Sequence, residues 1–444
     1  MNCQKISRRR FIGSVSATAA SVMVVPRHVL GGKGVQAPSD TLNIAGIGVG
    51  GRGRADLDGC RSQNIVALCD VDTDHATPTF RQYPHAAVYS DYRRMLDHEP
   101  DLDAVIIATP DHTHAVIATE AMRRGKHVYC EKPLTRTVAE ARALATMARD
   151  RGVVTQMGNQ GHAGDGTRQI REWIEAGVIG TVREVHYWTN RPIWPQAIDR
   201  PTEAHHTPPG VDWDLFLGPA PYRPYHPAYH PFRWRGWWDY GTGALGDIAC
   251  HSMDAAFWAL QLDQPNRIEA ETTGLFPETA PAVSRITYDF PARDSRPPVR
   301  FVWRDGGLAM PRPLQLVDGE RLPGGSSGQL FVGDDGVIGA DMYARGPRIF
   351  PTALHQDVVS SPPEQTYPRS PGVYLEWIEA CKGRGQTGAS FSEHAGPLTE
   401  VVLLGNLAVR TGRAIEWDAA RMRAVNVPEA NAFLDEEYRA GWSL

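Results

Sequence analysis

Three glycines with the spacing Gly48-x-Gly50-x-x-Gly53 follow a short apolar run, Leu42 to Ile47. In a strand–turn–helix unit, the first glycine of this spacing permits a tight turn. The second lets the backbone approach a pyrophosphate, and the third lets helix and strand pack closely. Backbone N–H groups at the start of the helix then face the phosphates. The spacing therefore predicts a dinucleotide-binding loop made of Gly48, Gly50, Gly51, Arg52 and Gly53.

A carboxylate follows this loop where an adenosine ribose would lie. Asp70 ends a second apolar run, Asn64 to Cys69, and comes about 20 residues after the glycines. A carboxylate there accepts hydrogen bonds from ribose hydroxyls and repels a 2′-phosphate. We therefore predict NAD as the cofactor, in preference to NADP.

Short apolar runs and helical patterns alternate over the first part of the chain. This alternation predicts an α/β fold with right-handed crossovers and a doubly wound parallel sheet, the Rossmann arrangement, whose ligands bind at the carboxyl ends of the strands. The predicted strands are 42–47, 64–69, 103–108, 127–130 and 153–157, and the predicted helices are 115–124 and 137–151. We assign residues 38–165 to this domain.

The pattern changes after residue 181, where strand follows strand. Partial alternation of apolar and polar residues predicts an α+β domain, residues 166–444, with a large, mostly antiparallel open sheet. The predicted strands are 182–189, 267–274, 284–290, 299–304 and 329–332, and the predicted helices are 374–382 and 398–411.

The first residues are typical of a leader segment. Ser7-Arg8-Arg9-Arg10-Phe11-Ile12 precedes an apolar, Ala- and Ser-rich stretch to Val25, and this order resembles a twin-arginine export signal. The twin-arginine route carries folded proteins, so it suits a protein that acquires a tightly held cofactor before export. We expect residues 1–37 to be the leader and the mature protein to be periplasmic or otherwise exported.

Composition excludes several other classes of protein. The formal net charge is -5, which predicts neither nucleic acid nor an anionic membrane as a partner. No apolar run approaches the roughly 20 residues of a membrane span. The six cysteines show no metal-binding spacing, and the histidines at 205, 206, 226 and 230 lack supporting Cys or Glu ligands. We predict no metal.

Three segments carry a family resemblance that extends from about Leu42 nearly to the C-terminus. Thr109-Pro110-Asp111-His112-Thr113-His114 and Glu131-Lys132-Pro133 follow predicted strands, and Gly243-Ala244-Leu245-Gly246-Asp247-Ile248-Ala249-Cys250-His251 lies further on. These segments resemble the signature loops of the glucose–fructose oxidoreductase, inositol dehydrogenase and MocA family. At Thr242, relatives often have a glycine, which puts only the local backbone shape in question.

The resemblance implies roles for individual residues. Thr109, Pro110, His114, Glu131 and Lys132 would contact the cofactor, and Lys132 would also reach a substrate hydroxyl. His251 would be the general base, a role that suits histidine because its unperturbed pKa lies near neutrality. Asp247, four residues earlier on the same helical face, would bind a neighbouring hydroxyl or orient the histidine. We predict Lys132, Asp247 and His251 as the catalytic residues.

The substrate site is predicted from two regions. Asn159, Gln160 and His162 follow the end of a predicted strand, where they can reach cofactor or substrate. Between Tyr187 and Tyr240 lies an insertion rich in aromatic residues, which could stack on sugar rings, although about half should only pack the loop. Predicted substrate-binding residues are Asn159, Gln160, His162, Arg191, Trp194 and Tyr240.

Three functions compete at this level. The first is an NAD-dependent oxidoreductase that moves hydride between a nicotinamide and a sugar or polyol hydroxyl, or between two sugars. The second is a glycoside hydrolase or lyase that oxidises a ring hydroxyl transiently, eliminates the glycosidic bond and returns the hydride. The third is a non-catalytic sugar-binding protein, against which Lys132, Asp247 and His251 argue. The resemblance also implies a homo-oligomer formed through the C-terminal sheet.

Overall fold

The computed structural model describes residues 40–444, and Leu42–Leu444 make up one unit of the chain. The predicted twin-arginine signal and the end of the leader at residue 37 lie outside the described residues.

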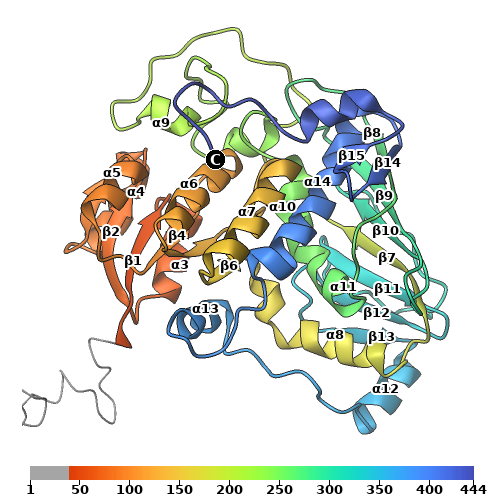
Figure 1. Cartoon of the computed structure of the whole chain (residues 1–444). Helices are drawn as coiled ribbons and strands as arrows, with labels where there is room; N and C mark the ends of the chain where they lie inside the picture. Colours follow the sequence, from red (N-terminus) through yellow and green to blue (C-terminus); the bar gives the residue numbers. More distant parts are fainter. Residues whose placement is uncertain (1–39) are drawn as a thin grey trace, which may run out of the picture. The chain divides into compact units, whose positions relative to one another are not determined.

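The first sheet is parallel and has six strands in the order β3-β2-β1-β4-β5-β6 (Figure 1). The chain runs outward from β1 in one direction and then restarts beside β1 with β4, which confirms the predicted doubly wound sheet. The strands are β1 (Asn43–Ile47), β2 (Asn64–Cys69), β3 (Ala87–Tyr89), β4 (Ala104–Ile107), β5 (His127–Cys130) and β6 (Thr155–Met157). The helices are α3 (Arg52–Gly59), α4 (Thr73–Gln82), α5 (Tyr92–His98), α6 (Asp111–Arg123) and α7 (Val138–Arg151).

Burial explains why these short runs form strands. All four residues of β4 are buried, as are four of the five residues of β1. Strands of a parallel sheet covered by helices on both faces have this continuous apolar character. The sheet therefore holds its carboxyl-end loops on a rigid base.

The glycine-rich turn between β1 and α3 depends on its missing side chains. Gly48 has a φ of +80°, which side-chain-bearing residues rarely adopt. A Cβ on Gly53 would lie 2.2 Å from the carbonyl oxygen of Gly48. The third glycine thus allows α3 to start against the turn, as its spacing predicts.

The second sheet has nine strands in the order β13-β12-β11-β7-β10-β9-β8-β14-β15. Pairing of β7 with β10 is parallel, and the other pairs described in this sheet are antiparallel, which confirms the predicted mostly antiparallel sheet. Its strands are β7 (Val182–Trp188), β8 (Arg267–Thr272), β9 (Ser284–Phe290), β10 (Val299–Arg304), β11 (Gly328–Gly333), β12 (Val337–Asp341), β13 (Arg348–Phe350), β14 (Ile415–Asp418) and β15 (Arg423–Ala424). The helices that follow the first domain are α8 (Asp165–Glu175), α9 (Trp213–Leu217), α10 (Gly243–Ser252), α11 (Asp254–Ala259), α12 (Thr352–Ser360), α13 (Val373–Cys381) and α14 (Gly396–Thr411). Shorter helical turns are η2 (Gln160–Ala163), η3 (Arg233–Gly236), η4 (Phe391–Ala395) and η5 (Pro428–Phe433).

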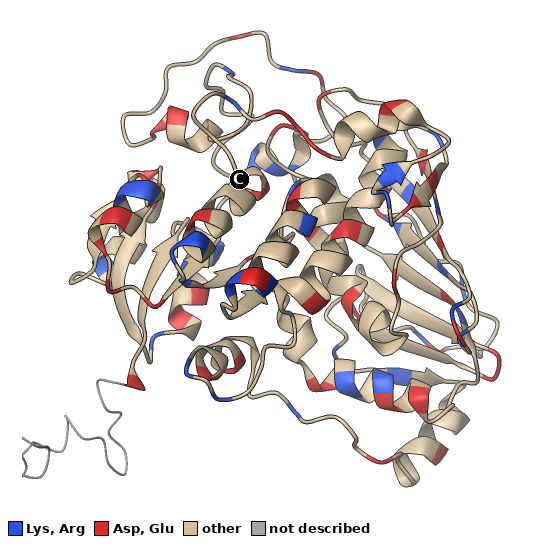
Figure 2. Ribbon diagram, viewed as in Figure 1, with Lys and Arg blue, Asp and Glu red and all other residues tan. Residues whose placement is uncertain are grey.

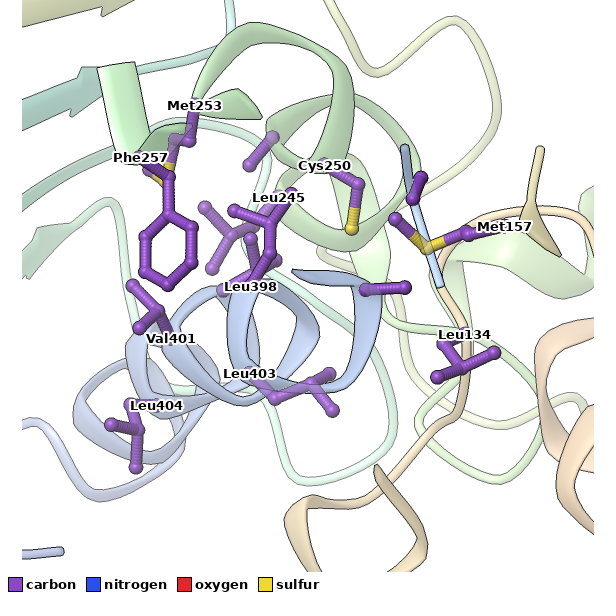
Figure 3. Packing of buried hydrophobic residues seen from close by; sticks show 14 of the residues in the cluster. Leu134, Met157, Leu245, Cys250, Met253, Phe257, Leu398, Val401, Leu403 and Leu404 are labelled. Atoms are coloured by element: carbon purple, nitrogen blue, oxygen red, sulfur yellow. The ribbon is translucent and has the colours of Figure 1, made fainter. Parts of the chain in front are cut away.

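Helices cover one face of this second sheet. Strand β9 alternates strictly between buried and half-buried residues, so one of its faces points into the core. Helix α14 packs against β8 and β9 and also against α7 of the first domain. Figure 3 shows Leu245 and Phe257 packing with Leu398 and Val401, with Leu134 from the first domain nearby. One apolar core therefore joins the two sheets.

The segment between β7 and α10 has little regular structure. Several of its aromatic residues pack into a cluster of their own, whereas Trp188, at the end of β7, packs elsewhere and Tyr222 is exposed. The cluster contains Trp213, Phe216, Leu217, Ala220, Tyr229, Trp234, Trp237 and Tyr240.

Charged residues of both signs are intermingled in the ribbon view (Figure 2), and the described cysteines are free thiols. In Figure 2 blue and red segments are interleaved, for example along α8, and do not separate by sign in that view. Five cysteines, those at 60, 69, 130, 250 and 381, are free thiols, and the first four of these are buried. Within residues 40–444, no helix has the length and apolar character needed to cross a bilayer.

Candidate active site

A cavity of about 490 Å³ opens at the carboxyl ends of β1, β2, β4 and β5. Its volume falls in the range of small-molecule and cofactor sites. The first domain contributes the glycine-rich turn and the loops after its strands, and the second domain contributes α10 and the loop between β12 and β13. Predicted site residues that line it are Gly48, Gly50, Gly51, Arg52, Asp70, Thr109, Pro110, Glu131, Lys132, Gln160, Arg191, Asp247 and His251.

Asp70 braces the glycine-rich turn. Its Oδ2 accepts hydrogen bonds from the backbone N–H of Val49 (2.7 Å) and of Gly50 (3.0 Å), and its Oδ1 accepts one from Asp72 (2.9 Å). Burial raises the pKa of Asp70, and these N–H groups oppose that effect. The carboxylate predicted to meet the ribose thus also fixes the loop that would meet the pyrophosphate.

Glu131 lies at the centre of a polar group beside the turn. Its Oε1 accepts hydrogen bonds from Arg52 Nε (3.1 Å) and Gln160 Nε2 (2.9 Å). All three side chains line the cavity. Contacts from α3 and η2 therefore hold the Glu131–Lys132 loop in place.

Lys132 and Asp247 form an ion pair across the two domains. Lys132 Nζ donates to Asp247 Oδ1 (3.0 Å) and to the Asp247 backbone carbonyl (2.6 Å), and Arg235 Nε donates to the same Oδ1 (3.3 Å). Burial would lower the pKa of Lys132, but Asp247 and Glu131 outweigh it and the pKa is raised. Burial would raise the pKa of Asp247, but Lys132 and Arg235 bring it down to about 2. Lys132 is therefore a positive charge at the cavity wall at neutral pH.

His251 is a neutral imidazole at the same wall. Burial, followed by the charge of Lys132, lowers the pKa of His251 to about 3. Its Nδ1 is 2.8 Å from Asn159 Oδ1, and the ring of Tyr343 packs on it with centroids 4.8 Å apart. A neutral imidazole beside a fixed cation can accept a proton from a hydroxyl group while the cation stabilises the oxygen.

Several predicted residues do not line this cavity. Gly53 lies beneath the turn, and His114 links the backbone carbonyls of Thr109 and Pro133, each at 2.8 Å from a ring nitrogen. Trp194 Nε1 donates to Gln196, and Tyr240 belongs to the aromatic cluster of the insertion.

Two more predicted substrate residues are likewise buried away from the cavity wall. Asn159 is fully buried and bonded to His251, Cys250 and Asp254, and His162 is bonded to Asp254. Their position after β6 suggested contact with a ligand, but both side chains contact Asp254 of α11 instead.

Some cavity residues were not predicted as site residues. Asp111 lines the cavity and accepts a hydrogen bond from Thr242 Oγ1 (2.7 Å). Tyr343 and Trp442 also line it. Asp111 belongs to the Thr109–His114 segment that carries the family resemblance, so the sequence did indicate that it could lie at the site. The other two have no local motif, because only the tertiary fold brings them here.

The insertion and the segment 435–444 cover the Asp70 end of the cavity. Asp212 N–H donates to the Val71 carbonyl (2.8 Å), and His230 Nε2 lies 2.6 Å from Asp72 Oδ2. Leu215, Phe216, His230, Pro231 and Trp442 line the cavity at this end, together with Ser90, Asp91 and Tyr92 from the first domain.

Segment 435–444 is fastened to its surroundings. Arg439 Nε donates to the Gly218 carbonyl (3.0 Å), and Arg123 donates to the Leu444 carbonyl (2.6 Å). The guanidinium carbon of Arg93 lies 4.7 Å from the Trp442 ring centroid. Figure 1 shows this end of the chain between α9 and α6.

One group of possible metal ligands occurs among residues 40–444, although we predicted no metal. His162, Asp254 and His394 are buried and place one ligand atom each within 4.8 Å of one another. The three come from η2, α11 and η4, so no local spacing could have indicated them.

Comparisons with known proteins agree with this architecture. Residues 42–159 match the model of an oxidoreductase family described as an NAD-binding Rossmann fold, and residues 167–294 match that family's C-terminal alpha/beta domain. Levoglucosan dehydrogenase of Pseudarthrobacter phenanthrenivorans is 30% identical over 189 residues, which are 43% of this chain and 40% of that protein. Inositol 2-dehydrogenase of Gluconacetobacter diazotrophicus is 35% identical over 150 residues, 32% of this chain and 44% of that protein.

These matches span less than half the length of either relative. Among solved structures, the WlbA dehydrogenase of Bordetella pertussis, in complex with NADH and UDP-GlcNAcA, superimposes with a TM-score of 0.58. It is 17% identical, and the match covers 85% of this chain and 99% of that one. At that identity the likeness establishes the fold alone. Both family models together, with the sheets and the glycine-rich turn described above, place this chain in the Gfo/Idh/MocA family of oxidoreductases.

Proposed function

We propose that this protein is an NAD-dependent oxidoreductase that transfers hydride between a sugar or polyol hydroxyl carbon and a tightly held nicotinamide cofactor. The observation that carries the proposal is the single cavity that joins the dinucleotide turn to Lys132, Asp247 and His251. The glycine-rich turn, braced by a buried carboxylate at the carboxyl edge of a parallel sheet, fits a dinucleotide.

The residues of the chain can move the proton that accompanies hydride transfer. NAD, when bound, supplies the hydride acceptor. His251 accepts the hydroxyl proton, and Lys132 stabilises the oxygen that loses it. The developing negative charge beside Lys132 offsets the positive charge that contributes to the low pKa of His251. Asp247 holds the Lys132 ammonium group in position.

The cofactor preference follows from Asp70. It is buried, carries no basic partner among its hydrogen bonds and lines the cavity beside the glycine-rich turn. A carboxylate in this position disfavours a 2′-phosphate, so NAD is preferred over NADP.

The substrate class follows from the relatives and from the cavity wall. The relatives described above are named as dehydrogenases of levoglucosan and inositol, both polyhydroxylated rings. The substrate side of this cavity has Trp234 and Phe232 beside Arg191 and Arg235. Aromatic faces and hydrogen-bond donors together suit a ring with apolar C–H faces and hydroxyl groups.

The test is to purify the full chain without added nucleotide, release its nucleotide by denaturation, and incubate native protein with deuterated sugars, polyols and glycosides. Bound NAD(H), and deuterium transferred to the nicotinamide or to a second sugar, are the expected results. Return of deuterium to the same sugar with solvent hydrogen on the adjacent carbon would instead indicate the glycoside hydrolase or lyase. The dehydrogenase names of the relatives do not favour that alternative. Absence of nucleotide and of NAD affinity would contradict the proposal.

Two further properties belong to the proposal. The protein is exported through the twin-arginine route, because Arg8 and Arg9 precede an apolar segment, and changing both to lysine should leave the precursor in the cytoplasm. It forms a homo-oligomer through the open face of the nine-stranded sheet, where ion pairs such as Arg300–Asp289 cross between strands. Light scattering of the purified chain measures that assembly.

A further inference from the structure

A buried line of polar side chains leads from His251 away from the cavity. His251 Nδ1 is 2.8 Å from Asn159 Oδ1. Asn159 Nδ2 donates to Asp254 Oδ1 (2.7 Å) and to the Cys250 carbonyl (2.9 Å). Asn159 and Asp254 are 0% and 1% exposed, so water does not replace these contacts.

The partners of Asn159 fix the orientation of its amide. Both groups near Nδ2, a carboxylate and a carbonyl, only accept hydrogen bonds. A flipped amide would place its oxygen against both acceptors, so Oδ1 must face His251. Because Oδ1 is itself only an acceptor, His251 Nδ1 must carry the hydrogen. Nε2 then holds the lone pair, and a general base at the cavity wall needs that tautomer.

Asp254 holds Asn159 in turn. Its Oδ1 also lies 3.0 Å from His162 Nδ1 and 2.6 Å from His394 Nε2. Burial would raise the pKa of Asp254, but the two histidines more than offset it, and the pKa is lowered. The buried carboxylate is therefore ionised, and it polarises the Asn159 amide whose oxygen faces His251.

Asp254, His162 and His394 could also be considered as ligands of a metal ion. In the structure Asp254 Oδ1 already faces Asn159 Nδ2, His162 Nδ1 and His394 Nε2, all at hydrogen-bond distances. A metal would require lone pairs on both histidine nitrogens, whereas hydrogen bonds to a carboxylate require N–H groups there. The geometry therefore favours a hydrogen-bonded anchor.

We propose that Asn159 is a positioning residue that fixes the Nδ1–H tautomer of His251, and that Asp254, held by His162 and His394, fixes Asn159. The consequence for catalysis rests on the proposed function, but the tautomer itself does not. Asn159 thus acts through His251 and does not touch the substrate.

The test uses the full chain labelled with ¹⁵N-histidine, compared with Asn159→Leu. In the wild type, the imidazole nitrogen signals of His251, assigned by their loss in His251→Gln, should report the Nδ1–H tautomer. In Asn159→Leu they should shift toward a tautomer mixture, and kcat should fall about 10-fold or more with little change in KM, up to the roughly 10²–10⁴-fold cost of losing a general base. Asn406→Leu is the control, because it removes another buried amide, bonded to the Thr242 carbonyl, without contact to His251.

Asp254→Asn gives a second measurement should Asn159→Leu fail to fold. The charged groups that act on His251 are Lys132, Asp247, Asp254 and Arg52. The titratable groups that face Asp254 are His162, His394 and Arg168. Since Asp254 raises the pKa of His251, its neutralisation should lower that pKa, and the acidic limb of the kcat profile should move to lower pH.

Three outcomes would overturn the proposal: an unchanged His251 tautomer in Asn159→Leu, an unmoved acidic limb in Asp254→Asn, or a stoichiometric metal ion lost in His394→Ala. Failure of the proposed function is a separate result. In that case wild-type protein shows the predicted tautomer but oxidises no sugar or polyol.

Discussion

Burial and neighbouring charge act differently on the two central residues of the cavity. Burial, together with Lys132, keeps His251 uncharged, whereas Asp247 and Glu131 keep Lys132 charged in spite of burial. A proton acceptor and a fixed cation therefore coexist at neutral pH. This combination is what removal of a hydroxyl proton requires.

Removal of either group should abolish most of the activity without loss of the cofactor. His251→Ala and Lys132→Met should each lower kcat by about 10²–10⁴-fold. The two losses should be less than additive in the double variant, because both groups act on one proton transfer. Rates in all three variants, together with their nucleotide content, check this. A double variant with normal turnover would place the chemistry elsewhere.

Among individual residues, the sequence allowed the cavity-lining loops to be predicted, but it did not reveal most of the residues that support them. Asp247 and His251 were recognisable because they are four apart on one helix, and Lys132 because it follows a strand end. Asp254 continues the same face three residues later and could have been noticed. His394 could not, since it is 140 residues away and meets Asp254 only in the fold.

Element prediction succeeded where apolar runs are continuous. Strands β1, β2, β4 and β5 have buried cores that local hydrophobicity reveals. The short strands β3 and β13 were not predicted, because β3 is only partly buried and β13 begins with an exposed arginine, so neither is a continuous buried apolar run. Strand β12 was also missed, since Gly339 interrupts its apolar pattern.

Helix α7 follows the Glu131–Lys132 loop, and its N-terminal cap allows its contribution to stability to be tested. Thr137 caps it by accepting a hydrogen bond from Glu140 N–H on its hydroxyl oxygen, and the Glu140 carboxylate accepts one from Thr137 N–H. Thr137→Ala should lower the free energy of unfolding by about 1 kcal/mol, because the helix N-terminus loses its acceptor. Thr137→Ser, which keeps the hydroxyl, should stay close to wild type. Urea denaturation measures both variants, and an equal unfolding midpoint for Thr137→Ala and wild type would contradict the capping role.

The whole molecule adds what neither sheet provides alone. The first domain supplies the edge of the parallel sheet where the cofactor would lie. The second domain supplies Asp247, His251 and Tyr343 to the same cavity. The insertion and segment 435–444 then cover the Asp70 end. Neither cover was predictable, because the insertion has little periodicity and the segment follows no motif. Their anchors, such as Arg439 to Gly218, are long-range.

The cover should slow the release of the cofactor. Trp442 lines the Asp70 end of the cavity and is held by the Arg93 guanidinium. We expect dissociation of a dinucleotide from that end to require movement of this segment or of the insertion. Trp442→Ala removes a large aromatic contact, and a loss near 1.4 kcal/mol would speed release about tenfold. Trp442→Phe keeps a ring and should release nucleotide more slowly than Trp442→Ala.

Tyr222→Ala serves as the control, because Tyr222 belongs to the insertion but is 67% exposed and outside the cavity wall. The measurement is the nucleotide remaining with each protein after repeated gel filtration, together with its release rate into a trap of NAD-consuming enzyme. Equal retention in Trp442→Ala and wild type would show that the cover plays no part in holding the cofactor.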